Sequence, residues 1–307
     1  GTPAFPGRFD SCDLPPKIQL NLLSELITCI NIFPQKESDI LENNLICFNN
    51  PLNFNDPFEF NTSFNFSSFE SNLYDSLSTV DLLKEFPAEL LNQIEKLPKE
   101  IVSNILKDAK KAMLSMYKKE KENIIRAADT TMQSFNSKLI GITRILSLTE
   151  TPTNILMWGH YAQAHSGFII EFDINHPFFS QRRGQKGEFG YLRKVIYQKE
   201  YPFLDPFSGD QINHFLIKSK DWEYEHEWRM LLPQANSGKT INVCEKEFDL
   251  YELPSDAIKT IIFGCNTSEH FKTKMFRLIS SRTDYEHISF IQAKKSNSRF
   301  EIVLDPL

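Results

Sequence analysis

The stretch WEYEHEWRML, residues 222–231, alternates between charged and apolar or aromatic residues, as a β-strand with one buried face does. Successive side chains of a strand point to opposite faces. The pattern therefore predicts one charged face and one face toward the core. The charged face holds Glu223, Glu225, Glu227 and Arg229, and the core face holds Tyr224, His226, Trp228 and Met230.

On both sides of this stretch, short apolar strands are separated by single helices. The helices are predicted at residues 153–165, 210–220 and 268–281, where apolar residues recur at helical spacing. Such an order is typical of an α+β domain whose sheet is mixed and mainly antiparallel. The predicted strands are FIIEFD (168–173), YLRKVIYQ (191–198), KTIIFGC (259–265), HISFIQAK (287–294) and RFEIVL (299–304).

Upstream, the chain divides into two parts. Residues 1–75 are predicted to hold a helix over 15–31, a short helix capped by Ser38, a first strand over 45–48 and a turn at Asn55-Asp56-Pro57. Residues 76–137 are predicted as an inserted helical pair, with breaks at Pro87 and Pro98. Residues 138–307 then complete the main α+β domain.

Composition excludes several classes of protein. The chain has 307 residues and a net charge of −6, which disfavours a wholesale nucleic-acid binder. No apolar run is long enough to span a bilayer, and no signal peptide is visible, so no membrane partner is expected. The odd number of cysteines, five, predicts reduced thiols. We therefore expect a cytoplasmic protein, or one delivered into the cytosol of a host or target cell.

The charged face of residues 222–231 allows two interpretations. On an exposed edge, its ion pairs contribute only ~0–1 kcal/mol each and have no chemical role. In a cleft, crowding raises the pKa of one carboxyl while Arg229 keeps another ionised. Glu225 and Glu227 are then candidate catalytic residues, one stabilising a cationic sugar-like transition state and the other taking a proton.

Aromatic residues on the helix at 153–165 form the second candidate feature. Trp158, Tyr161 and His165 fall at positions i, i+3 and i+7, on one helical face. This face either packs into the core or lines a pocket that stacks a planar ring.

Three shorter features also allow a structural and a functional interpretation. Ser147 and Thr149 place two hydroxyls on one side of a strand, which braces a site or occurs at an ordinary strand edge. Lys218 is either an anion ligand or a surface lysine. Asn55 and Asp56 either form a rigid turn or lie in a loop that closes over a pocket. No histidine or cysteine spacing predicts a metal site.

The order of these motifs resembles an uncharacterised bacterial family, the domain-of-unknown-function 2971 family. The resemblance covers roughly residues 40–265, and the two tryptophan-containing motifs are the most specific. It is carried by Phe54–Glu59, Ser147, Met157–Gly167, Glu171–Asp173, Val195–Tyr197 and Lys218–Arg229.

A looser similarity links the chain to ADP-ribosyltransferases of the arginine–serine–glutamate type. Their S-x-[ST] and E-x-E motifs match Ser147-Leu148-Thr149 and Glu225-His226-Glu227, in the same order. This resemblance implies that Glu227 holds a ribose hydroxyl of NAD and stabilises the oxocarbenium ion, and that Glu225 activates the acceptor. It also implies an aromatic wall for nicotinamide, supplied by Tyr161 or Trp158.

The sequence thus yields a leading hypothesis and two alternatives. The first is an NAD-consuming ADP-ribosyltransferase or NAD glycohydrolase, in a toxin, effector or defence protein, with NAD as co-substrate and a protein as one kind of acceptor. The second is a non-catalytic module that binds a nucleotide, an anion or another protein. The third is a metal-dependent nuclease.

Overall fold

The computed structural model describes residues 29–33, 39–66, 75, 87–94, 96–182, 187–205, 212–243 and 246–307. Most of the helix predicted at 15–31, together with the Ser38 cap, lies outside these residues. The chain forms two compact units. Unit 1 comprises Gly1–Glu59, Ile142–Lys199 and Leu216–Leu307, and unit 2 comprises Phe60–Gly141 and Glu200–Phe215.

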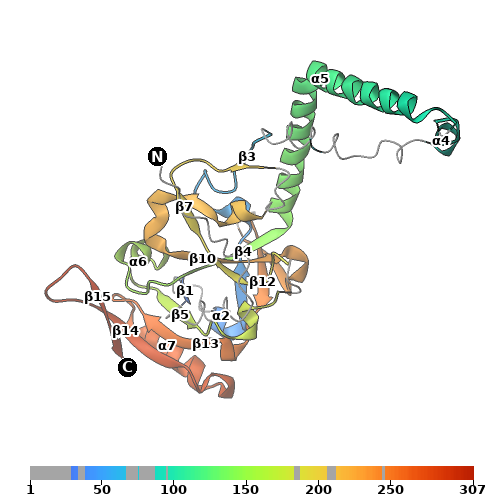
Figure 1. The fold of residues 1–307 in the computed structure, drawn as a ribbon. Coiled ribbons are helices and arrows are strands. Elements are labelled where there is room, and N and C mark those ends of the chain that lie inside the picture. The colour runs from blue at the N-terminus through green and yellow to red at the C-terminus, as the bar shows by residue number, and fades with distance from the viewer. Residues whose placement is uncertain are drawn as a thin grey trace, which may run out of the picture. The chain divides into compact units, whose positions relative to one another are not determined.

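Unit 1 is built on a sheet of eight strands in the order β15-β14-β13-β5-β1-β4-β10-β6 (Figure 1). Its neighbouring strands are antiparallel, except that β13 and β14 run parallel with α7 (Glu269–Ser280) between them in the chain. The predicted α+β class with a mainly antiparallel sheet is confirmed. The strands are β1 (Cys29–Phe33), β4 (Thr143–Thr149), β5 (Phe168–Phe172), β6 (Leu192–Lys194), β10 (Glu227–Pro233), β13 (Ile258–Phe263), β14 (Ser289–Lys295) and β15 (Ile302–Pro306).

Smaller sheets complete unit 1. The predicted first strand is β2 (Leu45–Phe48), which pairs with β12 (Lys246–Glu252) and through it with β11 (Lys239–Val243). Parallel strands β7 (Ile196–Gln198) and β9 (Ile217–Ser219) form a separate pair. Its short helices are α2 (Asp39–Asn43), α6 (Ile155–Tyr161) and the 3₁₀ turns η3 (Pro51–Asn53), η5 (Pro177–Phe179), η7 (Lys220–Glu225), η8 (Gln234–Asn236), η9 (Ser255–Ala257) and η10 (Thr283–Tyr285). The 3₁₀ turn η6 (Asn213–Leu216) belongs mostly to unit 2.

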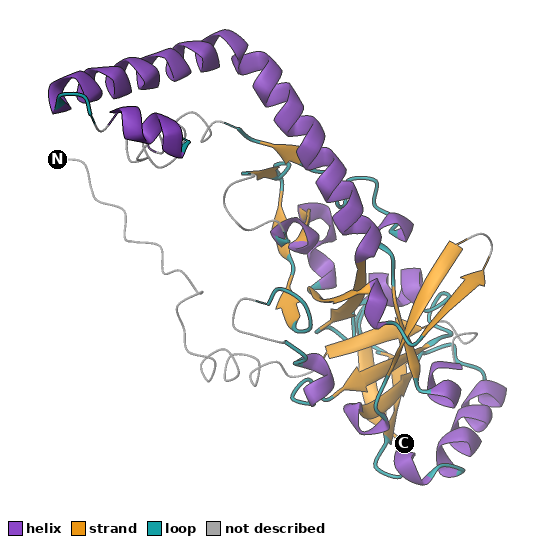
Figure 2. Cartoon of the chain, turned by 90° about the vertical axis from the view of Figure 1, so that its right-hand side faces the viewer, coloured by secondary structure: helices purple, strands orange, loops and turns teal. Residues whose placement is uncertain are grey.

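Unit 2 contains the long helix α5 (Lys99–Ile142), preceded by α4 (Ala88–Ile94), as Figure 2 shows. It also contains the parallel pair β3 (Ser63–Phe64) and β8 (Phe203–Leu204), which the sequence did not predict. Helix α5 continues five residues beyond the predicted boundary of the helical pair at residue 137, so residues 138–142 are also helical. The side-chain amide of Asn136 donates to the Thr62 hydroxyl at 2.9 Å.

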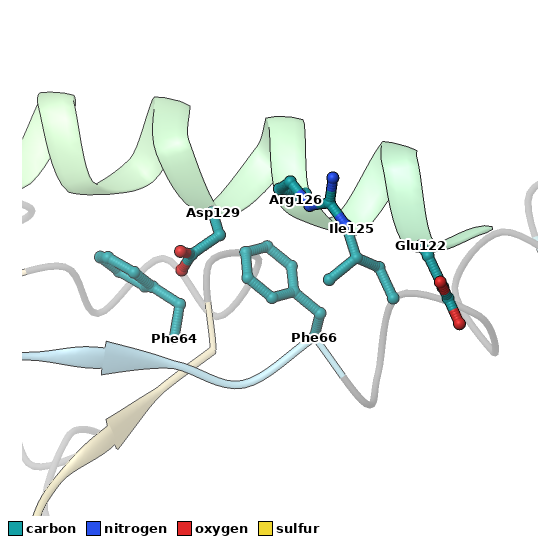
Figure 3. Close-up of a pocket in the computed structure, with 6 residues that line it drawn as sticks. All are labelled: Phe64, Phe66, Glu122, Ile125, Arg126 and Asp129. Atoms are coloured by element: carbon teal, nitrogen blue, oxygen red, sulfur yellow. The ribbon is translucent and has the colours of Figure 1, made fainter. Parts of the chain in front are cut away.

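An open groove of about 440 Å³ lies within unit 2 (Figure 3). The ring of Phe66 faces α5, and Phe64 lies beside Asp129. No residue that the sequence singled out as a candidate lines this groove, which is formed by Phe64, Phe66, Glu122, Ile125, Arg126 and Asp129.

The stretch WEYEHEWRML, residues 222–231, is only partly a strand. Ser219 caps the turn η7 by accepting the N–H of Asp221, and His226 then adopts a left-handed conformation with φ 45°. Strand β10 therefore starts at Glu227, not at Glu223. The predicted alternation fails before that point, because Glu223 is exposed and the His226 side chain is 47% exposed instead of facing the core.

Two predicted helices also differ from the structure. Helix α6, predicted over residues 153–165, is capped by Asn154 and ends at Tyr161. It ends there because the following Gln163, Ala164 and His165 all have positive φ, which a right-handed helix excludes.

The segment 210–220, predicted as one helix, contains η6 and then β9. Residues 29–31, predicted at the end of a helix, belong to strand β1. The predicted strand 191–198 divides at Val195 into β6 and β7, which belong to different sheets.

Candidate functional site

Strands β4 and β10 align the residues that the sequence singled out. Their antiparallel register sets Ser147 opposite Arg229, and Thr149 opposite Glu227. Directly opposite residues of an antiparallel pair point to the same face. These four candidate side chains therefore share one face of the sheet.

This face supports a buried charge cluster, which we define as Glu59, Lys218, Glu225, Glu227 and Arg229. Each of the five side chains is at most 7% exposed. They come from the loop after η3, from β9, from the end of η7 and from β10. Burial at this level rules out the exposed-edge interpretation for Glu225, Glu227 and Arg229, whereas Glu223 is exposed.

Within the cluster, Arg229 and Lys218 bridge the three carboxylates. Arg229 donates to both oxygens of Glu227, from Nε at 2.7 Å and from Nη2 at 2.9 Å. Its Nη2 also donates to Oε1 of Glu59. Lys218 Nζ donates to Oε2 of Glu225 at 2.5 Å and to Oε2 of Glu227 at 3.0 Å. Each carboxylate thus contacts at least one cation.

Aromatic side chains surround these charges. The Tyr161 hydroxyl donates to Oε1 of Glu225 at 2.7 Å, and this contact connects α6 to the cluster. The Tyr197 hydroxyl accepts the backbone N–H of Glu227 at 2.8 Å. Both cations make cation–π contacts with aromatic rings. Lys218 Nζ lies 5.0 Å from the ring centre of Trp222, and Arg229 Cζ lies 5.4 Å from the ring centre of Phe54.

The cluster holds three carboxylates but two cations, and the pKa values of two of the carboxyls shift in opposite directions. Burial alone would raise the pKa of Glu227, but Arg229 and Lys218 outweigh it and lower that pKa to about 2. Burial raises the pKa of Glu59, and the same two cations do not fully offset it. Glu227 is therefore firmly ionised, whereas Glu59 takes up a proton more readily than an ordinary glutamate.

Two buried oxygens of the cluster region have no hydrogen-bond partner among the described residues. These are Oε2 of Glu59 and Oγ of Ser147. Unsatisfied buried polar atoms are rare in proteins, and each calls for an explanation such as a catalytic role.

Other predicted site residues lie apart from these contacts. Trp158 has no exposed surface, and its Nε1 donates to the Pro152 carbonyl at 2.7 Å, so its ring is packed core and not an open wall. His165 stacks on Trp158, with ring centres 6.4 Å apart. Asn55 is exposed. Asp56 is buried and accepts the N–H of Phe58 at 2.9 Å, as the predicted turn requires.

Sequence reasoning missed two members of the site. Glu59 ends the motif Phe54–Glu59, in which the sequence favours Asn55 and Asp56, and Tyr197 ends the motif Val195–Tyr197. Both motifs contribute to the family resemblance. The signal was therefore present, but the choice within each motif depends on which side chain the loop or strand turns toward β10.

In the part of the chain that the structure describes, no three His, Cys, Asp or Glu side chains are arranged to hold a metal ion. None of the described helices is both long and apolar enough to cross a membrane. Cys47 and Cys265, whose side chains are described, carry no disulfide.

Comparison with known families returns one match, and it falls on this site. Residues 157–230 match a family described as protein of unknown function (DUF2971). The matched segment runs from within α6 to within β10 and contains every member of the cluster except Glu59. No curated protein and no solved structure matches the chain.

Proposed function

We propose that the protein cleaves the N-glycosidic bond of NAD at the buried charge cluster, as an ADP-ribosyltransferase or an NAD glycohydrolase. The observation that supports this most is the division between two carboxyls held by the same arginine. Glu227 has a lowered pKa and Glu59 a raised one. Pairs of carboxyls whose pKa values are pushed apart are typical of acid–base and stabilising roles in one site.

The chemistry follows from these protonation states. When the bond between C1′ of the ribose and the nicotinamide nitrogen breaks, nicotinamide leaves with the bonding electron pair and the ribose gains positive charge. An ionised Glu227 stabilises that charge, and the excess of one carboxylate in the cluster acts in the same direction. Water or an acceptor group then bonds to C1′ and releases its proton to Glu59.

Glu225 has a supporting role in this scheme. It accepts from the Tyr161 hydroxyl and from Lys218, and so connects α6 to the cluster. Because all five side chains are nearly inaccessible, the residues that cover them must move when a substrate enters. Tyr161, half-buried on α6, donates to Glu225 and in this scheme would stack the nicotinamide ring after such a movement.

A second candidate function is a non-catalytic nucleotide- or anion-binding module. The closed arrangement favours it, because every charged side chain of the cluster already has an oppositely charged partner. Such a protein would bind a ligand without turnover.

The test is incubation of the full chain with NAD and chromatographic measurement of free nicotinamide. We expect release by the unaltered protein and a loss of at least a hundredfold in Glu227→Gln. Glu223→Gln is the matched control, because Glu223 is an exposed glutamate only four residues away. It should keep full activity.

Absence of nicotinamide release by the unaltered protein would overturn the proposal, as would equal activity of Glu227→Gln when circular dichroism shows that variant folded. Ligand-dependent thermal stabilisation without turnover would favour the binding module. Nucleic-acid cleavage that a chelator abolishes would favour the nuclease.

A further inference from the structure

Beyond the cluster, the same face of the sheet continues onto the edge strand β6. Arg193 lies directly opposite Arg229 in the β10–β6 pairing. Its side chain therefore points to the face that carries Glu227 and Ser147, one strand farther toward the sheet edge. Adjacent strands are ~4.8 Å apart, so Arg193 is a near neighbour of the charge cluster.

A second arginine lies against the same aromatic ring. The Cζ atom of Arg182 is 4.6 Å from the ring centre of Tyr191, and that of Arg193 is 4.9 Å from it. Gly190 makes this approach possible: its φ is +89°, and a Cβ there would lie 2.9 Å from the backbone of Gln181. The segment before Arg182 can thus pair closely beside Tyr191, through the bridge between Ser180 and Tyr191.

Arg193 is not fully satisfied in this position. Its Nη1 and Nη2 donate to Glu188, at 3.0 Å to the carboxylate and 2.7 Å to the backbone carbonyl. Its Nε is buried and has no acceptor within the described residues. Burial lowers the pKa of Arg193, and the positive charge of Arg182 lowers it further. An additional anion would accept from the Arg193 Nε and would offset the repulsion between Arg182 and Arg193.

We propose that Arg182, Tyr191 and Arg193 form a binding site for a phosphoryl anion, in competition with the Glu188 carboxylate. Guanidinium groups match the geometry of phosphate oxygens through paired N–H donors. Glu188 is 45% exposed, so it can leave Arg193 at little cost in packing. If NAD is the substrate, which rests on the proposed function, its diphosphate is the anion that this site holds.

The test is calorimetric titration of the full chain with inorganic pyrophosphate at low salt. Arg193→Gln should weaken binding at least tenfold, and Glu188→Gln should strengthen it, because the competing carboxylate is gone. Lys194→Gln is the matched control: Lys194 is the next residue, points to the opposite face and pairs with Glu150. It should bind within twofold of the unaltered protein.

Lack of pyrophosphate binding by the unaltered protein would overturn the site, and so would equal weakening in Arg193→Gln and Lys194→Gln. If circular dichroism shows that Arg193→Gln is unfolded, Arg182→Gln decides by the same tenfold criterion. Pyrophosphate binding without nicotinamide release supports this site and contradicts the proposed function. Nicotinamide release without pyrophosphate binding supports the proposed function and contradicts this site.

Discussion

Strand β4 borders two buried groups of charged side chains that differ in how completely they are paired. Near its start, Arg144 donates from Nε to Asp249, whose other oxygen accepts from the Thr240 hydroxyl at 2.5 Å. That group has one cation and one carboxylate, both at most 2% exposed. Near its end, β4 faces the charge cluster, with three carboxylates and two cations.

The difference separates a structural ion pair from a candidate reactive site. The Arg144–Asp249 pair is neutral as a whole and needs no further partner. The cluster carries an excess negative charge and an unsatisfied oxygen on Glu59. A buried excess of this kind is relieved by a proton or by positive charge on a ligand. Uptake of a proton and development of positive charge on the substrate are both steps in the reaction that we propose.

The largest loss in the free energy of unfolding is expected when the central arginine of each group is removed. Breaking one buried ion pair typically costs ~3–5 kcal/mol. Arg144→Met should fall in that range. Arg229→Met should exceed it, since both Glu59 and Glu227 lose a partner. Urea unfolding measures the two costs, and the comparison fails if Arg229→Met is the less destabilised variant.

A smaller effect is expected from two tyrosine hydroxyls. Tyr161 donates to the Glu225 carboxylate at 2.7 Å, and Tyr251 donates to the Pro233 carbonyl at 2.9 Å near the Arg144–Asp249 pair. A hydrogen bond to a charged group contributes ~1.5–3 kcal/mol and one to a neutral group ~0.5–1.5 kcal/mol.

Tyr161→Phe should therefore lower the free energy of unfolding more than Tyr251→Phe, as measured by urea denaturation of both variants. Equal losses would contradict the account of the cluster.

Much of the fold could be predicted from the sequence, because strands such as β2, β5 and β13 are short apolar runs with clear boundaries. The hairpin of β11 and β12 was missed, since its residues alternate weakly and are rich in charge. Residues 222–226 were assigned to a strand because periodicity alone does not reveal the Ser219 cap or the left-handed His226.

Only part of the site could be predicted from the sequence. The local pattern suggests Ser147, Glu225, Glu227 and Arg229 as candidates. It does not show that these side chains meet, because the register between β4 and β10 is known only once the two strands are seen to pair. Glu59 lies in a loop more than 150 residues before β10 in the chain, and Arg193 lies on an edge strand. Both positions depend on the tertiary fold.

The division of protonation states between Glu227 and Glu59 can be measured without any substrate, by following the glutamate carboxyl carbons with NMR while the pH is varied. The Glu227→Gln and Glu59→Gln variants assign the two signals. We predict that Glu227 stays ionised until the pH approaches 2, so that the stabilisation it provides is lost only as the pH falls from about 4.5 toward 2.

Glu59 should take up its proton above 4.5, so that any stabilisation it provides is lost as the pH rises through its pKa. Separate titrations on the two sides of 4.5 would support the account. A shared titration of Glu227 and Glu59 near 4.5 would contradict it.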